Sequence, residues 1–245
     1  MAAEKSLRPT SEAPGIAVII VTYNAAPYLQ NCLNSIYRQE YPSINIIVID
    51  GSSTDGTVAI LQQNSERIYK WISEKDEGIY DAMNKALGHV TDPWVYFLGA
   101  DDTLRPEFSK FAGNLIDPAA IYYANVIHNG IKRSEEVSPY YMAKVGIYHQ
   151  AIVYPAAVFR NRRYQLKYRI AADYALNMEC FSDKNFHYIY KDYIIANYNH
   201  TGISATVTDI PFERDKASLI LKNFGFKIWA RFMFRLLKAK ISKKR

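Results

Sequence analysis

The strongest constraint on the fold of this chain is a regular alternation of short apolar runs and segments of helical periodicity between residues 16 and 98. Ile16–Val21 is a run of mostly β-branched residues, which is typical of a strand buried on both faces of a sheet. Strands that alternate with helices predict a layered α/β fold whose sheet is mostly parallel. Further strands are predicted at Ile44–Ile49, Tyr69–Ser73 and Trp94–Leu98, and helices at Pro27–Tyr37, Thr57–Gln63 and Ile79–Leu87.

The rest of the chain divides into a leader, a less regular second half and a tail. Residues 1–14 are polar and contain two prolines, which predicts a disordered leader. Residues 15–210 are predicted to form one domain, and residues 211–245 one helix, or two helices separated at Gly225. Within the second half of the domain, 120–126, 151–154 and 188–197 are strand-like and 173–181 is helix-like.

The net charge of +6 is unevenly distributed along the chain. Ten Lys or Arg follow Asp215 with no acidic residue among them, whereas the other 20 basic residues are outnumbered by the 24 acidic ones. A basic body that binds nucleic acid is therefore not supported, and the C-terminus is the part expected to bind anionic partners.

Several classes of protein are excluded by what the sequence lacks. The apolar runs are far shorter than the ~18 residues of a membrane span, and the first fifteen residues contain no apolar signal core. Cys32 and Cys180 are the only cysteines, which excludes a disulfide scaffold and suits a reducing cytoplasm. The glycine fingerprints of dinucleotide sites and of P-loops are also absent.

Polar clusters follow three of the predicted strands, at residues 22–24, 50–56 and 99–102. In open α/β sheets, ligands bind outside the carboxyl ends of the strands, so these clusters are candidates for a binding site. Asp101 and Asp102 have the oxygen ligands that Mg²⁺ or Mn²⁺ prefers. Taken alone, the pair is more simply explained as the start of a turn or a helix cap, and residues 50–56 as a β-to-α turn with Asp55 as N-cap.

Four segments in order, VIIVTYNAAPYLQNCLNSI, NIIVIDGSSTDGT, SEKDEGIYDAMNKAL and WVYFLGADD, resemble family 2 inverting glycosyltransferases of the GT-A fold. The resemblance is to bacterial enzymes of capsule, exopolysaccharide and O-antigen assembly, and it is close over residues 16–106. It implies a Rossmann-like mixed sheet flanked by helices, with a nucleotide-binding half at 15–106 and an acceptor half at 107–210. It also implies transfer of a hexosyl group from a nucleotide-sugar, with UDP favoured, to a saccharide hydroxyl of a lipid-linked acceptor.

The resemblance also assigns roles to individual residues. Asp101 matches the metal-binding acid of the family's DxD motif, which implies Mn²⁺ or Mg²⁺ as cofactor. Gly99 stands where the first acid of that motif falls, and this departure puts the strength of metal binding in doubt. The resemblance implies nucleotide binding by Thr22, Tyr23, Asn24, Asp50, Ser52, Asp76, Gly78, Ala100 and Asp101.

The catalytic base is expected downstream, because in a single displacement a carboxylate must accept the proton of the attacking hydroxyl. Asp173, in the segment Ile-Ala-Ala-Asp-Tyr, matches the family's base, with Ala172 replacing a common acid. A simple cap of the following helix is the alternative. Asp102, His149 and Gln150 are expected on the acceptor or diphosphate side, Asn84 in packing and loop positioning, and His200 in a surface turn.

The tail has the pattern of a basic amphipathic helix. Trp and Phe on one face, opposite Lys and Arg, are typical of helices that lie in an anionic membrane interface. We therefore expect a peripheral protein at the cytoplasmic face of the membrane; the alternative is an apolar face that packs on the domain. The basic side carries Lys227, Arg231, Arg235 and Lys238, and the apolar side Ile228, Trp229, Phe232, Met233, Leu236 and Leu237.

Two other functions compete with sugar transfer. A nucleotidyltransferase has a related sheet, but it needs a glycine-rich loop with a basic residue early in the chain, and VTYNAAPYL does not supply one. A non-catalytic module that binds nucleotide-sugars or glycans is the second alternative. Asp50, Asp101 and Asp173 argue against such a module, whereas Gly99 leaves it open. The sequence carries no indication of the oligomeric state.

Overall fold

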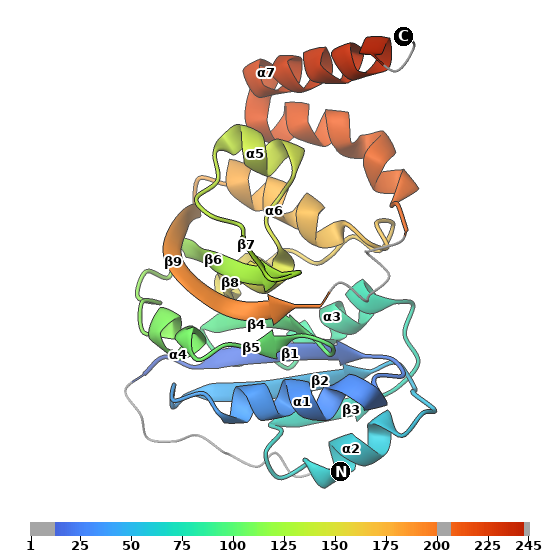
Figure 1. Cartoon of the computed structure of the whole chain (residues 1–245), viewed down its shortest axis with the longest axis vertical. Coiled ribbons are helices and arrows are strands. Elements are labelled where there is room, and N and C mark those ends of the chain that lie inside the picture. The colour runs from blue at the N-terminus through green and yellow to red at the C-terminus, as the bar shows by residue number, and fades with distance from the viewer. Residues whose placement is uncertain (1–12, 200–206, 243–245) are drawn as a thin grey trace.

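A computed structural model of the chain describes residues 13–199 and 207–242. Most of the predicted leader, the turn predicted at His200 and the last three residues lie outside the described part. In Figure 1 the sheet crosses the middle of the molecule, α2 lies at one end, and α5, α6 and α7 lie at the other. The strands are β1 Ile16–Thr22, β2 Ile44–Asp50, β3 Lys70–Ser73, β4 Trp94–Gly99, β5 Thr103–Leu104, β6 Ala120–His128, β7 Ile131–Arg133, β8 Ile152–Pro155 and β9 His187–Tyr198.

The helices cover both faces of this sheet. Clusters of buried side chains join α1, α2 and α4 to one face of the sheet and α3, α5, α6 and α7 to the other. The helices are α1 Ala26–Tyr37, α2 Thr57–Gln63, α3 Ile79–Leu87, α4 Glu107–Ala112, α5 Pro139–Lys144, α6 Ala172–Ser182 and α7 Ile210–Ser242, with short 3₁₀ helices η1 His149–Ala151 and η2 Ala156–Arg160.

The sheet is mixed, with strand order β3-β2-β1-β4-β8-β6-β9-β5 and with β7 paired to β6. β1, β2, β3 and β4 are parallel, and Thr22 lies in register with Asp50 at the ends of β1 and β2. β8 joins the two halves by pairing antiparallel with both β4 and β6. The polar clusters at the ends of β1, β2 and β4 therefore meet at one edge, as the sequence predicts.

β1 is buried on both faces, and its alternate residues point to opposite layers. Ala17 and Ile19 pack with α3 in one cluster, whereas Ile16, Val18 and Ile20 pack with α1 in the other. This arrangement explains why the sequence of the strand is continuously apolar instead of alternating.

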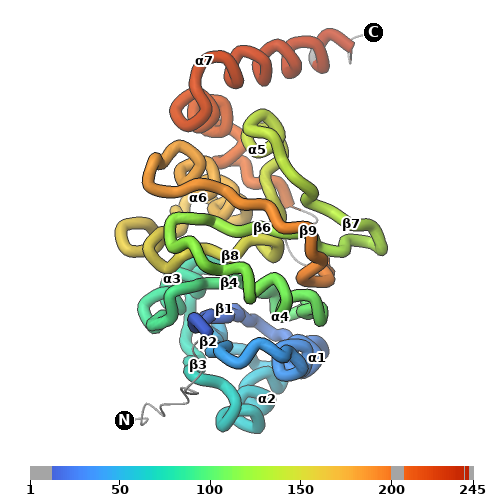
Figure 2. Tube along the Cα trace, turned by 90° about the vertical axis from the view of Figure 1, so that its left-hand side faces the viewer, coloured from blue at the N-terminus to red at the C-terminus, as the bar shows by residue number. Residues whose placement is uncertain are grey.

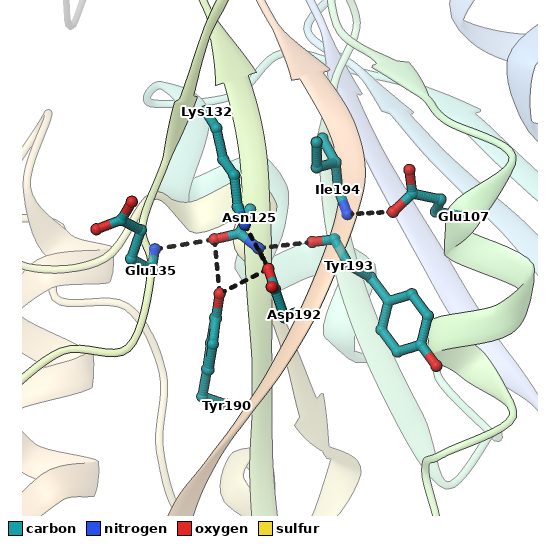
Figure 3. Close-up of polar contacts among 8 residues, drawn as sticks. All are labelled: Glu107, Asn125, Lys132, Glu135, Tyr190, Asp192, Tyr193 and Ile194. Atoms are coloured by element: carbon teal, nitrogen blue, oxygen red, sulfur yellow. Dashed lines mark hydrogen bonds and ion pairs between the residues drawn. The ribbon is translucent and has the colours of Figure 1, made fainter.

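A buried asparagine joins β6, β7 and β9 where the pairing of β6 with β9 is irregular (Figure 3). Asn125, fully buried, donates from Nδ2 to Asp192 Oδ1 and to the Tyr193 carbonyl, both at 3.0 Å. Its Oδ1 accepts from the Glu135 amide at 2.9 Å and the Tyr190 hydroxyl at 3.2 Å. Because Glu135 follows β7, the Asn125 side chain fixes the hairpin that carries Arg133 and Ser134.

α7 changes direction at Gly225, where φ is 78° and the backbone leaves the helical region. The predicted break between two helices is thus confirmed. The second half of α7 turns back over the first at the end of the molecule farthest from α2 (Figures 1 and 2). Among the described helices, none combines the length and the apolarity that crossing a bilayer requires.

Candidate functional site

A cleft of about 760 Å³ opens where the ends of β1 and β4 meet residues of the second half of the domain. Residues of α3, of the β7 hairpin, of α5 and of α6 also line it. Parallel pairing of β1 with β4 explains why segments that are far apart in sequence reach the same place. Of the residues predicted for the site, the cleft is lined by Tyr23, Asn24, Ala100, Asp101, His149, Gln150 and Asp173.

Thr22 and Asp50 do not line the cleft; they form a buried pair at the ends of β1 and β2. The Asp50 carboxylate accepts hydrogen bonds from Thr22 Oγ1 at 2.8 Å, Ser73 Oγ at 2.6 Å, and the amide and hydroxyl of Ser53. Burial raises the pKa of Asp50, but these hydrogen bonds outweigh burial and hold the pKa below its ordinary value. Asp50 thus joins the ends of β1, β2 and β3, and its contact with a base or ribose stays a prediction.

Tyr23 and Asn24 follow β1 and lie at the mouth of the cleft. The Asn24 amide donates to Ser53 Oγ at 2.7 Å, and Asn24 Oδ1 accepts from the Thr54 amide at 2.9 Å. These bonds tie the loop after β1 to the loop after β2. The Tyr23 ring is 69% exposed beside the tied loops, which leaves an aromatic face on which a base can stack.

Asp76, Gly78 and Ser52 also lie outside the cleft lining. Asp76 Oδ1 accepts from the Gly78 amide at 2.9 Å, and a Cβ at Gly51 would lie 2.5 Å from Asp76 Oδ2. Gly78 has φ 123° and ψ 178°, a conformation that glycine adopts and L-residues rarely do. The exposed Ser52, with φ 62°, occupies the turn after β2. Nucleotide contacts of these three residues remain predictions.

The two acids that follow β4 have different environments. Asp101 lines the cleft, whereas Asp102 is 1% exposed and lies behind it. Asp102 Oδ2 accepts from Gln150 Nε2 at 2.8 Å, and its Oδ1 accepts from the Asn199 amide at 2.7 Å. Burial raises the pKa of Asp102 to about 7. Asp102 therefore holds Gln150 and the end of β9 in place.

Position 99 has no room for the acid that the family motif places there. A Cβ added to Gly99 would lie 2.5 Å from Asp102 Oδ2 and 3.0 Å from Asp101 Oδ1. The Asp102 carboxylate is held there by its hydrogen bonds, so it cannot easily move away. Gly99 is thus a packing requirement of this chain, and the missing acid follows from the buried position of Asp102.

The side chains that line the cleft suit a divalent cation that is held partly by the protein and partly by a substrate. Within residues 13–199 and 207–242, no three His, Cys, Asp or Glu side chains form a ready metal cage. Mg²⁺ is commonly bound by one or two carboxylates together with substrate phosphates, and Mn²⁺ has a similar preference for oxygen ligands. Asp101 lines the cleft, and it is the carboxylate expected for such a site.

Restoring the missing acid is expected to harm this chain. Gly99→Asp should lower the free energy of unfolding by about 1–3 kcal/mol, because the new side chain overlaps the fixed Asp102 carboxylate and adds a like charge. Urea denaturation measures the change. Gly113→Asp, at an exposed site where a Cβ meets no atom closer than 3.5 Å, is the control. Equal stabilities of the Gly99 variant and the wild type would contradict this account of position 99.

Asp173 lies in the first turn of α6 and faces the cleft. The N-cap of α6 is Ala171, without a side-chain cap, and the Ile170 and Ala171 amides donate instead to Asp209 Oδ2. Asp173 is therefore not the cap of its helix. Its Oδ1 accepts from the Tyr80 hydroxyl at 2.6 Å, which fixes the carboxylate from the side of α3.

His149 begins η1 and is held on two sides. Its ring stacks on Phe97 with centroids 4.8 Å apart, and its Nε2 lies 3.0 Å from the Tyr164 hydroxyl. Burial lowers the pKa of His149, and the negative charge of Asp173 offsets only part of this effect. The imidazole is accordingly neutral at pH 7. One ring nitrogen can donate a hydrogen bond and the other can accept one, and the ring brings no positive charge to the cleft.

Sequence reasoning missed several residues of the cleft. Arg133 and Arg169 line it and bring positive charge to the cleft. Arg169 lies close to Asp173 in sequence and could have been noticed, whereas only the β7 hairpin brings Arg133 to the cleft. Asn84, predicted to position a loop, donates to the Tyr164 carbonyl and accepts from the Tyr164 amide, each at 2.9 Å.

Comparison with known proteins connects this geometry to a family. The sequence matches the family described as Glycosyl transferase family 2 over residues 17–191. A PGL/p-HBAD biosynthesis glycosyltransferase of Mycobacterium tuberculosis H37Rv is 33% identical over 217 residues, which cover 82% of this chain and 83% of the relative. A Bacillus subtilis protein named for teichuronic acid biosynthesis, TuaG, is 38% identical over 101 residues, 40% of each chain.

Solved structures agree on the fold. S. aureus TarS residues 1–349, in complex with UDP, gives a TM-score of 0.69 at 21% identity and covers 89% of this chain and 70% of that one. The chain spans 40% of the longer TarS structure. The mannosyltransferase PcManGT of Pyrobaculum calidifontis, with GDP-Man and Mn²⁺, gives 0.61 at 19% identity and covers 95% of this chain and 79% of that one. The sheet and flanking helices are thus those of GT-A glycosyltransferases.

Proposed function

Because the chain belongs to glycosyl transferase family 2, we propose that its cleft transfers a sugar from a nucleotide-sugar to a saccharide hydroxyl. The observation that carries the proposal is that Asp101 and Asp173, from opposite halves of the domain, face one cleft. One acid suits the leaving diphosphate and the other the attacking hydroxyl. We propose a single displacement with inversion at the anomeric carbon.

The position of a side chain supports each proposed role. Asp173 accepts the proton of the acceptor hydroxyl as that oxygen attacks the anomeric carbon, and Tyr80 keeps the carboxylate oriented. Arg133 and Arg169 favour an anionic donor through their positive charge, and Tyr23 offers a stacking surface to the base. Asp101 would hold Mn²⁺ or Mg²⁺, which when bound offsets negative charge on the phosphates.

The donor and acceptor classes are part of the proposal. We favour a UDP-sugar with a hexosyl group, since the TarS structures are named as complexes with UDP and UDP-GlcNAc. Names of relatives that refer to PGL/p-HBAD and teichuronic acid support an acceptor of cell-surface glycoconjugate assembly, which we take to be lipid-linked. The enzyme would then work at the cytoplasmic face of the membrane.

A turnover assay tests the proposal. The full chain is incubated with UDP-, GDP- and dTDP-sugars, Mn²⁺ and lipid-linked saccharides, and nucleoside diphosphate release and product mass are measured. Transfer predicts release of one nucleotide and a product heavier by one sugar residue. Binding of a nucleotide-sugar without turnover under any of these conditions would favour the non-catalytic module that Gly99 leaves open.

A further inference from the structure

The face of the C-terminal helix that is open to a partner differs from the face that the sequence predicts. Ile228, Trp229, Phe232 and Met233, which the sequence assigns to a membrane-facing side, pack against the domain, and Phe232 is only 8% exposed. The Arg231 guanidinium lies 3.9 Å from the centre of the Tyr140 ring in α5. Phe232 is buried and the other three are partly buried against the domain, so this side of the helix is not the one that is open to a membrane.

A second apolar stripe points away from the domain. Phe226, Phe234, Leu237 and Ile241 are 70%, 71%, 57% and 63% exposed, respectively. They are spaced by 8, 3 and 4 residues along the helix after Gly225, so they share one side of it. Single exposed apolar residues are ordinary, but such a row marks an interaction surface.

Positive charge borders this outward stripe. Lys227, Arg235 and Lys238 are exposed beside it, and the helix after Gly225 contains no acidic residue. A symmetric dimer through this surface would bring the basic residues of both copies to one interface, where this helix has no acidic residue to pair with them. Anionic lipid headgroups offer the opposite charge together with an apolar layer, so the composition favours a lipid surface over a second copy.

We propose that the stripe of Phe226, Phe234, Leu237 and Ile241, with its basic border, docks the protein on an anionic lipid surface. The same half of α7 packs on α5, whose Tyr141 lines the cleft. Docking would therefore bring the cleft close to the headgroups. Only the benefit for a lipid-linked acceptor rests on the proposed function; the docking itself does not.

Vesicle co-sedimentation of the full chain tests the proposal. Truncation is unsuitable because Phe212 and Ile220, in the first half of α7, are core residues. We expect binding to phosphatidylcholine vesicles that contain phosphatidylglycerol, and an at least ~10-fold lower partition coefficient for the combined variant F234S, L237S and I241S. The control replaces three exposed residues elsewhere, Ile116, Ile131 and Leu166, by Ser and should bind like the wild type.

A second variant tests the basic residues beside the stripe. Replacing Lys227, Arg235 and Lys238 by Gln should weaken binding to the anionic vesicles and reduce its dependence on salt. Equal pelleting of wild type and the F234S, L237S and I241S variant would overturn the proposal. The proposal would also be overturned if the wild type formed a dimer that this variant dissociates and neither protein bound the vesicles. These vesicles contain no donor or acceptor, so failure of sugar transfer leaves the result unaffected.

Discussion

Replacing Asp173 by Asn is expected to lower the rate of sugar transfer by about 10³-fold, the size of effect that removing a general base produces. The amide nearly preserves the shape of the carboxylate but cannot accept the proton of the acceptor hydroxyl. Tyr80 can still donate to the remaining carbonyl oxygen, so the fold of the cleft should persist. Affinity for the nucleotide-sugar should therefore change by no more than about twofold.

Transfer kinetics and calorimetric binding, measured on the same preparation, separate the two effects. Asp117→Asn is the control, because the half-exposed Asp117 pairs with His187 and does not line the cleft. Retained transfer in the Asp173 variant would show that another group is the base. Loss of donor binding together with transfer would indicate that Asp173 serves the donor side instead.

Replacing Asp101 by Asn is expected to abolish the effect of Mn²⁺ on nucleotide affinity and to slow transfer by about 10²-fold. Asp101 supplies the carboxylate that faces the cleft. Gly99 has no side chain to replace it, and Asp102 is buried outside the cleft lining. Titration of a nucleoside diphosphate with and without Mn²⁺ gives the two affinities directly.

Asp102→Asn provides the contrast for the Asp101 variant. Asp102 accepts hydrogen bonds from two donors, Gln150 and the Asn199 amide, so an amide there would place a donor against a donor. Its main effect should be a lower Tm. If the Asp101 variant keeps its full response to Mn²⁺ while the Asp102 variant loses it, the assignment of the two acids is reversed.

The sequence predicts the first half of the domain well because its signals are local. Ile16–Val21 is apolar since both faces of β1 are buried, and the predicted helix Thr57–Gln63 is found with the same bounds. Parallel pairing then dictates that the residues after β1 and β4 meet. The short elements of the second half, such as α4 and β7, have too few residues to show a period.

Other features of the site depend on tertiary contacts that no local pattern encodes. The bond between Tyr80 and Asp173 joins residues 93 positions apart, and the buried Asn125 brings the hairpin with Arg133 to the cleft. The tail shows the same limit. Helical spacing predicts that Phe232 is on an apolar side, but only packing against α5 and the first half of α7 decides that this side faces inward.

The central claim is that the cleft binds an activated nucleotide with the help of a divalent cation, and a thermal-shift series tests it most directly. UDP, GDP, dTDP and CMP are added to the full chain, each with and without Mn²⁺. We predict that one nucleoside diphosphate raises Tm by about 5–10 °C near 100 times its Kd, and that the rise is larger with Mn²⁺. A folded protein whose Tm no nucleotide changes at millimolar concentration would contradict the claim.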